Sequence, residues 1–233
     1  MGKNSNRAIL VLESPWELDS EDSNRSSVLP FVEGVARLTD NTEVYHANFY
    51  DKNSFDFALN CLCKTQFKNT IVYIAAHGYK QKIGNMKISD LLFKIGLKST
   101  EYNITGVMLG SCFVGENTTT MEAFIQDTNL KWCSGYSSSS MWLEGTMIDC
   151  AILAKMSHIG KREFSEGPRL INCFAEALSP FSKTYEIGED YKDNPVSLEN
   201  SMQFVIQPTG KGRHARTVSS DVFDVHDSFQ LEG

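Results

Sequence analysis

The sequence lacks any apolar run near the roughly 18 residues that a membrane-spanning helix needs. Its first apolar run, Ala8 to Leu12, is followed at once by Glu13, which does not fit a secretory signal peptide. We therefore expect a cytoplasmic protein that has no membrane partner. Positive charge is also scarce, because 22 Lys and Arg residues against 29 Asp and Glu residues give a formal charge of −7. That balance argues against nucleic acid as a partner.

Motifs for nucleotide and metal binding are missing as well. Neither a G-x-G-x-x-G nor a G-x-x-x-x-G-K-[ST] loop follows the first apolar run, which disfavours a dinucleotide-binding or P-loop protein. Of the six cysteines, Cys61 and Cys63 form a C-x-C pair without the second ligand pair that zinc needs, and the others are scattered. Without a secretory signal, disulfides are not expected. We therefore expect reduced cysteines, no metal and no cofactor.

What the sequence does contain is a regular alternation of strand and helix patterns over its first two-thirds. Apolar runs predict strands at 8–12, 42–49, 70–76, 106–110 and 130–136. Helical spacing of apolar residues predicts helices at 28–38, from Asn53 as a cap, from Ser89, and at 119–127. This alternation predicts an α/β fold in which a mostly parallel sheet is covered by helices on both faces.

The last third is less regular. We expect helices at 144–158 and 168–178, a polar loop at 183–200, and a strand at 202–207. The chain then reads as one α/β domain over residues 1–209, followed by a polar C-terminal tail over 210–233. Within this tail, Val222, Phe223 and Phe229 are possible docking points, and the rest is expected to fray.

Two chemically reactive residues follow consecutive buried strands. His77 comes at the end of the third strand, and Cys112 comes at the end of the fourth. In parallel α/β sheets, ligands bind at the carboxyl ends of the strands. If these strands are neighbours, their axes lie ~4.8 Å apart and both side chains overhang one crevice. A thiol beside an imidazole is the minimum unit for nucleophilic catalysis by cysteine.

The residues next to this pair fit the same chemistry. Gly78 has no side chain, so its N–H can approach a developing oxyanion closely, and the Cys112 N–H can supply a second donor. The other histidines and cysteines lie inside predicted elements or in the tail, where a structural role explains them. A buried cysteine or a His-Gly turn is common when it occurs alone. The placement of His77-Gly78 and Cys112 at the ends of two consecutive strands favours a catalytic site.

In this arrangement the chain resembles the caspase-like (clan CD) cysteine peptidases. The resemblance rests on the segments Ile71 to Gly78 and Val107 to Cys112, with His-Gly before Cys as in that family. It covers about residues 7–160 and is closest to compact bacterial caspase-like proteins. Those begin with Leu-Glu-x-x-Trp, echoed at Leu12 to Trp16, and carry a later Gly-Tyr…Trp segment, echoed at Gly135 to Trp142.

The resemblance implies a three-layer caspase-like sandwich and a cysteine endopeptidase with a His-Cys dyad. His77 would be the general base or acid, Cys112 the nucleophile, and Gly78 with Cys112 the oxyanion hole. The substrate, a peptide or protein, would add as an extended strand along a segment that contains Tyr136, Ser140, Met141 and Trp142. It also implies a role in a bacterial signalling or defence pathway, with a regulatory protein partner.

Three departures leave the substrate preference open. Residue 141 is Met where the compact relatives have an acid, Gly110 stands where metacaspases have one, and no arginine is nearby as in true caspases. The alternative is a non-catalytic caspase-like scaffold or partner-binding module. The four serines at 137–140 have little apolar area, so we expect them to be mobile in the free protein.

Overall fold

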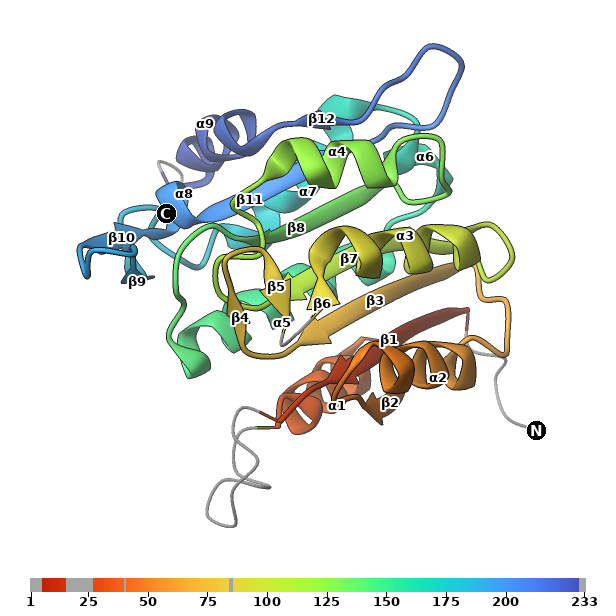
Figure 1. Cartoon of the computed structure of the whole chain (residues 1–233). Helices are drawn as coiled ribbons and strands as arrows, with labels where there is room; N and C mark the ends of the chain where they lie inside the picture. The colour runs from red at the N-terminus through yellow and green to blue at the C-terminus, as the bar shows by residue number, and fades with distance from the viewer. Residues whose placement is uncertain (1–5, 16–26, 40, 84–85, 231–233) are drawn as a thin grey trace.

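A seven-stranded sheet forms the centre of the computed structural model, which describes residues 6–15, 27–39, 41–83 and 86–230 (Figure 1). Its strands, in spatial order, are β12 (Arg216–Thr217), β11 (Met202–Ile206), β8 (Trp132–Tyr136), β7 (Ile104–Gly110), β3 (Asn69–Ala75), β1 (Arg7–Glu13) and β2 (Thr42–Asn48). Strands β2, β1, β3, β7 and β8 pair in parallel, whereas β11 runs antiparallel to β8 and β12. The predicted mostly parallel sheet is therefore confirmed.

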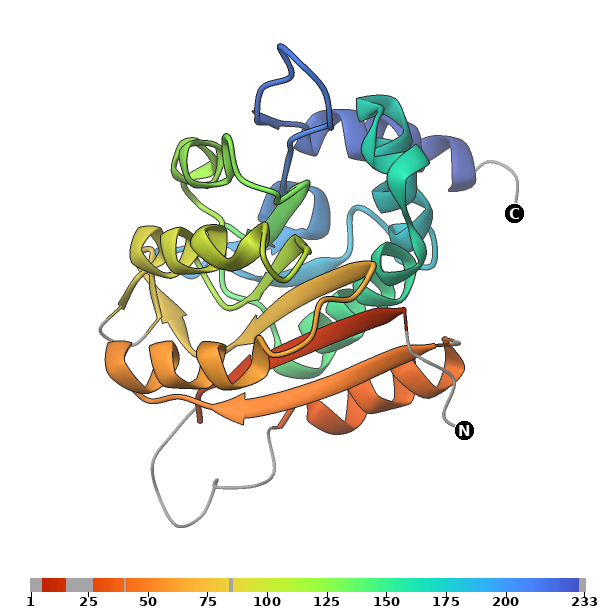
Figure 2. The same ribbon diagram turned by 90° about the vertical axis from the view of Figure 1, so that its right-hand side faces the viewer.

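Helices cover both faces of this sheet and give three layers (Figure 2). On one face lie α2 (Lys52–Leu62), α3 (Ile88–Ser99) and α4 (Thr118–Ile125); on the other lie α1 (Leu29–Leu38), α5 (Trp142–His158) and α7 (Gly167–Leu178). Helix α9 (Ser219–Gln230) packs on α7, and two short helices, α6 (Lys161–Phe164) and α8 (Leu198–Ser201), connect elements. No helix in the described ranges is both long and apolar enough to cross a membrane.

The continuous apolar strands follow from this layering, because each central strand is buried on both faces. In β1, Ile9 and Val11 belong to the core under α1, α5 and α7, whereas Leu10 and Leu12 belong to the core under α2, α3 and α4. Strand side chains alternate between faces, so a run without polar residues fills both cores.

Two small sheets lie beside the large one. Directly after β3, a three-stranded antiparallel sheet contains β4 (Gly78–Tyr79), β5 (Lys82–Ile83) and β6 (Met86–Lys87). The second small sheet is a hairpin of β9 (Glu186–Glu189) and β10 (Pro195–Ser197). Figure 1 shows β4 and the β9–β10 hairpin toward the end of the molecule to which β3 points.

Three local features differ from the sequence-based expectations. Helix α2 is capped by Asp51, whose carboxylate accepts from the Ser54 N–H at 2.8 Å, and not by Asn53. Residues 183–200, expected to form a polar loop, contain β9, β10 and most of α8. The tail that was expected to fray contains β12 and α9, whereas Val222 and Phe223 are buried, in agreement with their expected docking. In α9, Val222, Val225 and Phe229 recur at helical spacing, a pattern that the polar composition of the tail obscured.

Substitution of a glycine in the sheet, with a helix glycine as the control, tests how tightly the sheet is packed. A Cβ atom at Gly106 would overlap the ring of Trp132 on the neighbouring strand, whereas a Cβ at Gly34 in α1 would meet nothing within 4 Å. We expect Gly106→Ala to destabilise the protein by about 1–3 kcal/mol through overpacking. Gly34→Ala should stabilise it by about 0.5–1 kcal/mol, because alanine favours the helix. Urea unfolding measures both changes, and an unchanged stability for Gly106→Ala would contradict this packing.

Candidate active site

The ends of β3 and β7 bring the two predicted reactive residues to the same edge of the sheet. The strands are parallel neighbours with Ala75 opposite Gly110, and His77 and Cys112 each follow two residues later. A Cβ atom at Gly78 would overlap the carbonyl oxygen of Cys112 and lie 3.1 Å from its nitrogen. The backbones of the two loops are therefore in direct contact, which only glycine at position 78 allows.

The exposure of the two side chains differs. His77 is exposed, whereas Cys112 is only 6% exposed. The Cys112 Sγ accepts a hydrogen bond from the Ser140 N–H at 3.3 Å, and the Ser140 Oγ lies 3.9 Å from the same sulfur. An N–H directed at sulfur stabilises negative charge there. Ser140, predicted from the resemblance to line the cleft, thus lies beside the nucleophile candidate.

The loop after Cys112 is held by the end of β8 and the segment that follows it. Phe113 has φ of 60°, in the left-handed region that non-glycine residues rarely adopt, and its N–H donates to the Ser138 carbonyl at 2.9 Å. The Gly115 N–H donates to the Tyr136 carbonyl at 2.8 Å. Such strained residues are found at functional sites and persist only where the surroundings hold them.

The four serines are better anchored than their composition suggests. The Ser137 N–H donates to the Ser201 carbonyl at 2.8 Å, and the Ser138 and Ser201 hydroxyls are 2.6 Å apart. The Ser139 N–H donates to the Glu189 carbonyl at 2.9 Å. The expectation of mobility considered only apolar area, whereas hydrogen bonds to α8 and β9 hold this segment.

The remaining predicted substrate-binding residues lie in different environments. Tyr136 is fully buried, so its side chain contacts the core and not solvent. Met141 is 43% exposed, and its N–H donates to the Ile187 carbonyl at 2.8 Å. Trp142 is half-buried and packs edge-on against Phe31, with ring centroids 5.6 Å apart. Of these three side chains, that of Met141 is the most accessible to a ligand.

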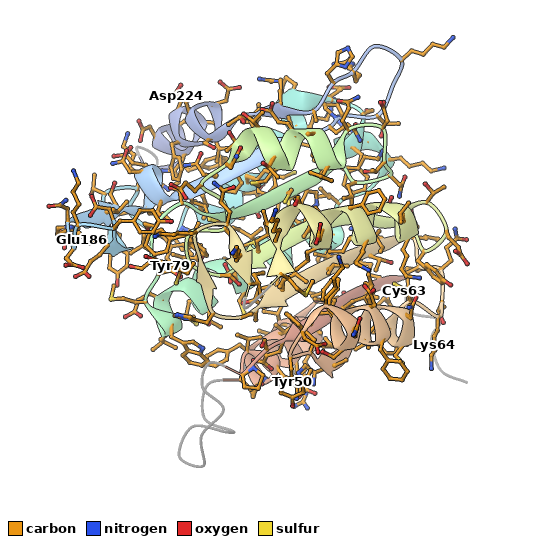
Figure 3. The ribbon with its side chains drawn as sticks, in the orientation of Figure 1. Tyr50, Cys63, Lys64, Tyr79, Glu186 and Asp224 are labelled. Atoms are coloured by element: carbon orange, nitrogen blue, oxygen red, sulfur yellow. The ribbon has the colours of Figure 1, made fainter. Side chains whose placement is uncertain are left out.

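A hollow of about 370 Å³ lies next to Ser140. It is lined by Ser139, Ser140, Met141, Glu186, Gly188, Glu189 and Pro195. Its charged lining residues, Glu186 and Glu189, are both acidic and come from β9. Figure 3 shows Glu186 toward the same end of the molecule as Tyr79, which follows Gly78. The sequence gives no signal for either glutamate, because residues 183–200 have no periodic pattern.

An aromatic cluster joins the β9–β10 turn to both reactive loops. Tyr191 stacks on Phe113 with ring centroids 4.2 Å apart, and Tyr79 meets Phe113 and Tyr191 edge-on at 6.2 and 5.7 Å. The Tyr191 hydroxyl donates to Glu116 at 3.1 Å. The pKa of Tyr191 is raised to about 12, mainly by burial and to a smaller extent by this hydrogen bond. The hairpin is therefore attached to the loops that carry His77 and Cys112.

A buried polar cluster lies directly beneath the site. The Asp149 carboxylate, from α5, accepts from the Tyr73 and Tyr136 hydroxyls at 2.7 Å each. A Cβ atom at Gly110 would overlap this carboxylate, so Asp149 fills the space beside the residue two before Cys112. Burial raises the pKa of Asp149 to about 7, although the two hydrogen bonds oppose the shift. The only sequence signal for this buried carboxylate is the position of Asp149 between Ile148 and Cys150 in a predicted helix.

The end of β1 carries a second buried carboxylate. Glu13 accepts from the Ser27 hydroxyl and the Val28 N–H at 2.8 Å each, and lies 3.0 Å from His46 Nε2. It thereby satisfies an N–H at the start of α1. Glu13 belongs to the Leu-Glu-x-x-Trp echo, whose tryptophan, Trp16, lies outside the described residues.

The structure holds no disulfide among its six cysteines, all of which are described. Within the described ranges, no group of three or more His, Cys, Asp or Glu side chains is placed to hold a metal ion.

Comparison with known proteins finds similar solved structures but no match among protein families or curated proteins. Among solved structures, the chain is similar to a secreted C11 cysteine protease from Bacteroides thetaiotaomicron, "iotapain", at 10% sequence identity and a TM-score of 0.49. That likeness covers 94% of this chain and 68% of the other.

The buried Asp149 predicts a pH dependence of stability. Its pKa is about 7 in the folded chain and near the ordinary 3.8 when unfolded, so the folded state binds a proton more tightly. The stability from this proton is fully present below the unfolded pKa and is lost as pH rises through about 7. Asp149→Asn removes this contribution. Urea unfolding gives the free energy of unfolding of wild type and of Asp149→Asn. The wild-type value minus the variant value should fall as the pH rises from 5 to 8. An unchanged difference would contradict it.

Proposed function

We propose that this chain is a caspase-like cysteine endopeptidase in which His77 and Cys112 form the catalytic dyad. The observation that carries the proposal is the contact of Gly78 with the Cys112 backbone at the ends of β3 and β7. It supports one reaction centre, because an imidazole and a thiol extend from two loops in direct contact. The cytoplasmic location, the signalling or defence role and the regulatory protein partner remain predictions from the sequence.

The proposed reaction proceeds in two steps. His77 accepts the Cys112 proton, and the thiolate attacks the scissile carbonyl carbon. The Gly78 and Cys112 N–H groups stabilise the resulting oxyanion. As the C–N bond breaks, His77 returns the proton to the leaving amine and a thioester remains on Cys112. Water, activated by His77, then hydrolyses the thioester and restores the thiol.

The proposed substrate binds along residues 140–142, beside the hollow lined by Glu186 and Glu189. The N–H groups of Ser139 and Met141 are already bonded to β9, so a peptide would have to add on the Cys112 side of this segment. The two glutamates favour a basic substrate side chain over an acidic one, because like charges repel. This acidic lining comes from β9, and not from position 141.

A non-catalytic binding module is the second candidate function. The observation that favours it is the covering of Cys112, whose sulfur is largely shielded and directed to the Ser140 N–H. In this alternative, the exposed Met141 and the adjoining hollow bind a partner without chemistry.

A peptide-library cleavage screen separates the two candidates. We expect wild type to cleave peptides with basic residues in preference to acidic ones. Cys112→Ala should lower the cleavage rate at least about a thousandfold, since it removes the nucleophile. His77→Ala should lower it about 10²- to 10⁴-fold, as loss of a general base does.

Cys61→Ala and His214→Ala are matched controls, because Cys61 lies on α2 and His214 in an exposed loop. Both should cleave like wild type. If Cys112→Ala retains the cleavage of wild type, or if wild type cleaves nothing while Cys112→Ala retains its biological effect, the peptidase proposal fails.

A further inference from the structure

A second concave site lies at the opposite edge of the sheet, where β1 and β3 begin. It has a volume of about 630 Å³, within the range of about 300–1,000 Å³ that is usual for small-molecule sites. Its lining residues are Asn6, Arg7, Gln66, Phe67, Lys68, Asn69, Asn103, His158, Ile159, Gly160 and Lys161. We call it the cationic cavity.

The charge of this cavity is opposite to that of the chain. Arg7, Lys68 and Lys161 contribute three positive charges, His158 contributes a fourth when protonated, and none of the lining residues is acidic. Neither Lys68 nor Lys161 forms an ion pair with any residue that the structure describes. In a chain of formal charge −7, this concentration of cations attracts anions to one place.

Side-chain amides hold the backbone segments that carry Lys68 and His158. The Asn103 side chain donates to the Phe67 and Lys68 carbonyls at 3.0 and 2.6 Å. The Asn69 side chain, 3% exposed, donates to the Ser157 and Ile159 carbonyls at 3.0 and 3.2 Å, on either side of His158. A site whose segments are already ordered loses less entropy when a ligand binds.

Two acids, Glu101 and Glu163, lie two residues along the chain from a lining residue, and neither lines the cavity. Glu163, on α6, accepts from the Gly160 N–H at 2.9 Å and closes the first turn of that helix. This hydrogen bond lowers the pKa of Glu163, so its carboxylate is ionised and occupied at neutral pH. It is not among the lining residues of the cationic cavity.

We propose that the cationic cavity binds a phosphorylated small molecule of about nucleotide size. Lysine and arginine bind phosphate oxygens through charge-assisted hydrogen bonds, and three such cations exceed what a single carboxylate needs. The side-chain amides of Asn6 and Gln66 offer donors and acceptors to the organic part of the ligand, and Ile159 offers an apolar surface. No glycine-rich phosphate loop is involved, which is why no sequence motif predicts this site.

This proposal is independent of the proposed peptidase function. Strand β3 begins at Asn69 in the cavity and ends before His77, and a seven-residue strand spans roughly 23 Å at about 3.3 Å per residue. Figure 3 shows Lys64, which precedes the cavity residue Gln66, at the opposite side of the molecule from Tyr79. A ligand here would not contact Cys112.

Isothermal titration of the full chain with ATP, inorganic phosphate and citrate, at low salt and without divalent cations, tests the proposal. Wild type should bind ATP saturably at one site and bind citrate more weakly. Lys68→Glu and Lys161→Glu should each weaken ATP binding at least about tenfold, because a repulsive charge replaces an attractive one. Lys211→Glu makes the same charge change in an exposed loop outside the cavity and should leave ATP binding within about twofold of wild type.

Circular dichroism and urea unfolding check that each variant is folded. Absence of saturable ATP binding to wild type overturns the proposal, as does equal weakening by Lys211→Glu. Citrate binding as tight as ATP overturns the assignment to phosphate. Cys112→Ala should bind ATP as wild type does. Loss of ATP binding in Cys112→Ala would place the ligand at the other edge and overturn the proposal without deciding whether the chain is a peptidase.

Discussion

The parallel pairing of β3 with β7 is the constraint on which the candidate site depends. Because both strands end at the same edge, the loops that follow them meet, and Gly78 lies against the Cys112 backbone. The rest of the edge holds this contact in place. Strand β8 and the serines after it bind the loop after Cys112, and β9 binds those serines in turn. The aromatic cluster of Tyr79, Phe113 and Tyr191 attaches the β9–β10 hairpin to the two loops.

Beneath this edge, the largely apolar core contains the carboxyl group of Asp149. Burying Asp149 is costly, and the hydroxyls of Tyr73 and Tyr136 offset part of that cost by donating to it. These three side chains come from β3, β8 and α5, so they link the strands and the helix that surround Gly110. Tyr136 therefore supports the site from inside the core, in contrast to its expected place in a substrate cleft.

Much of the fold was predictable because buried parallel strands are continuous apolar runs, as 8–12 and 70–76 illustrate. The placement of His77 and Cys112 at one edge of the sheet was predictable because each lies within two residues of the end of such a strand. Glu186 and Glu189 were not, because their position beside Ser140 arises from pairing of β9 with a segment far away in the sequence. The same holds for the cationic cavity, which collects Arg7, Lys68 and Lys161 from three separate segments. Helix α9 was missed because the polar composition of the tail predicted fraying, although Val222, Val225 and Phe229 recur at helical spacing.

The central claim is that His77 and Cys112 act as one catalytic unit. Mass spectrometry after treatment with a peptidyl chloromethyl ketone that ends in a basic residue tests it most directly. The account predicts one adduct, on Cys112, that is lost in His77→Ala and retained in His214→Ala. Cys61, the only cysteine that is not buried, serves as the internal control for non-specific alkylation and should stay unmodified. Equal labelling of Cys112 in His77→Ala, or labelling of Cys61 in place of Cys112, would contradict the account.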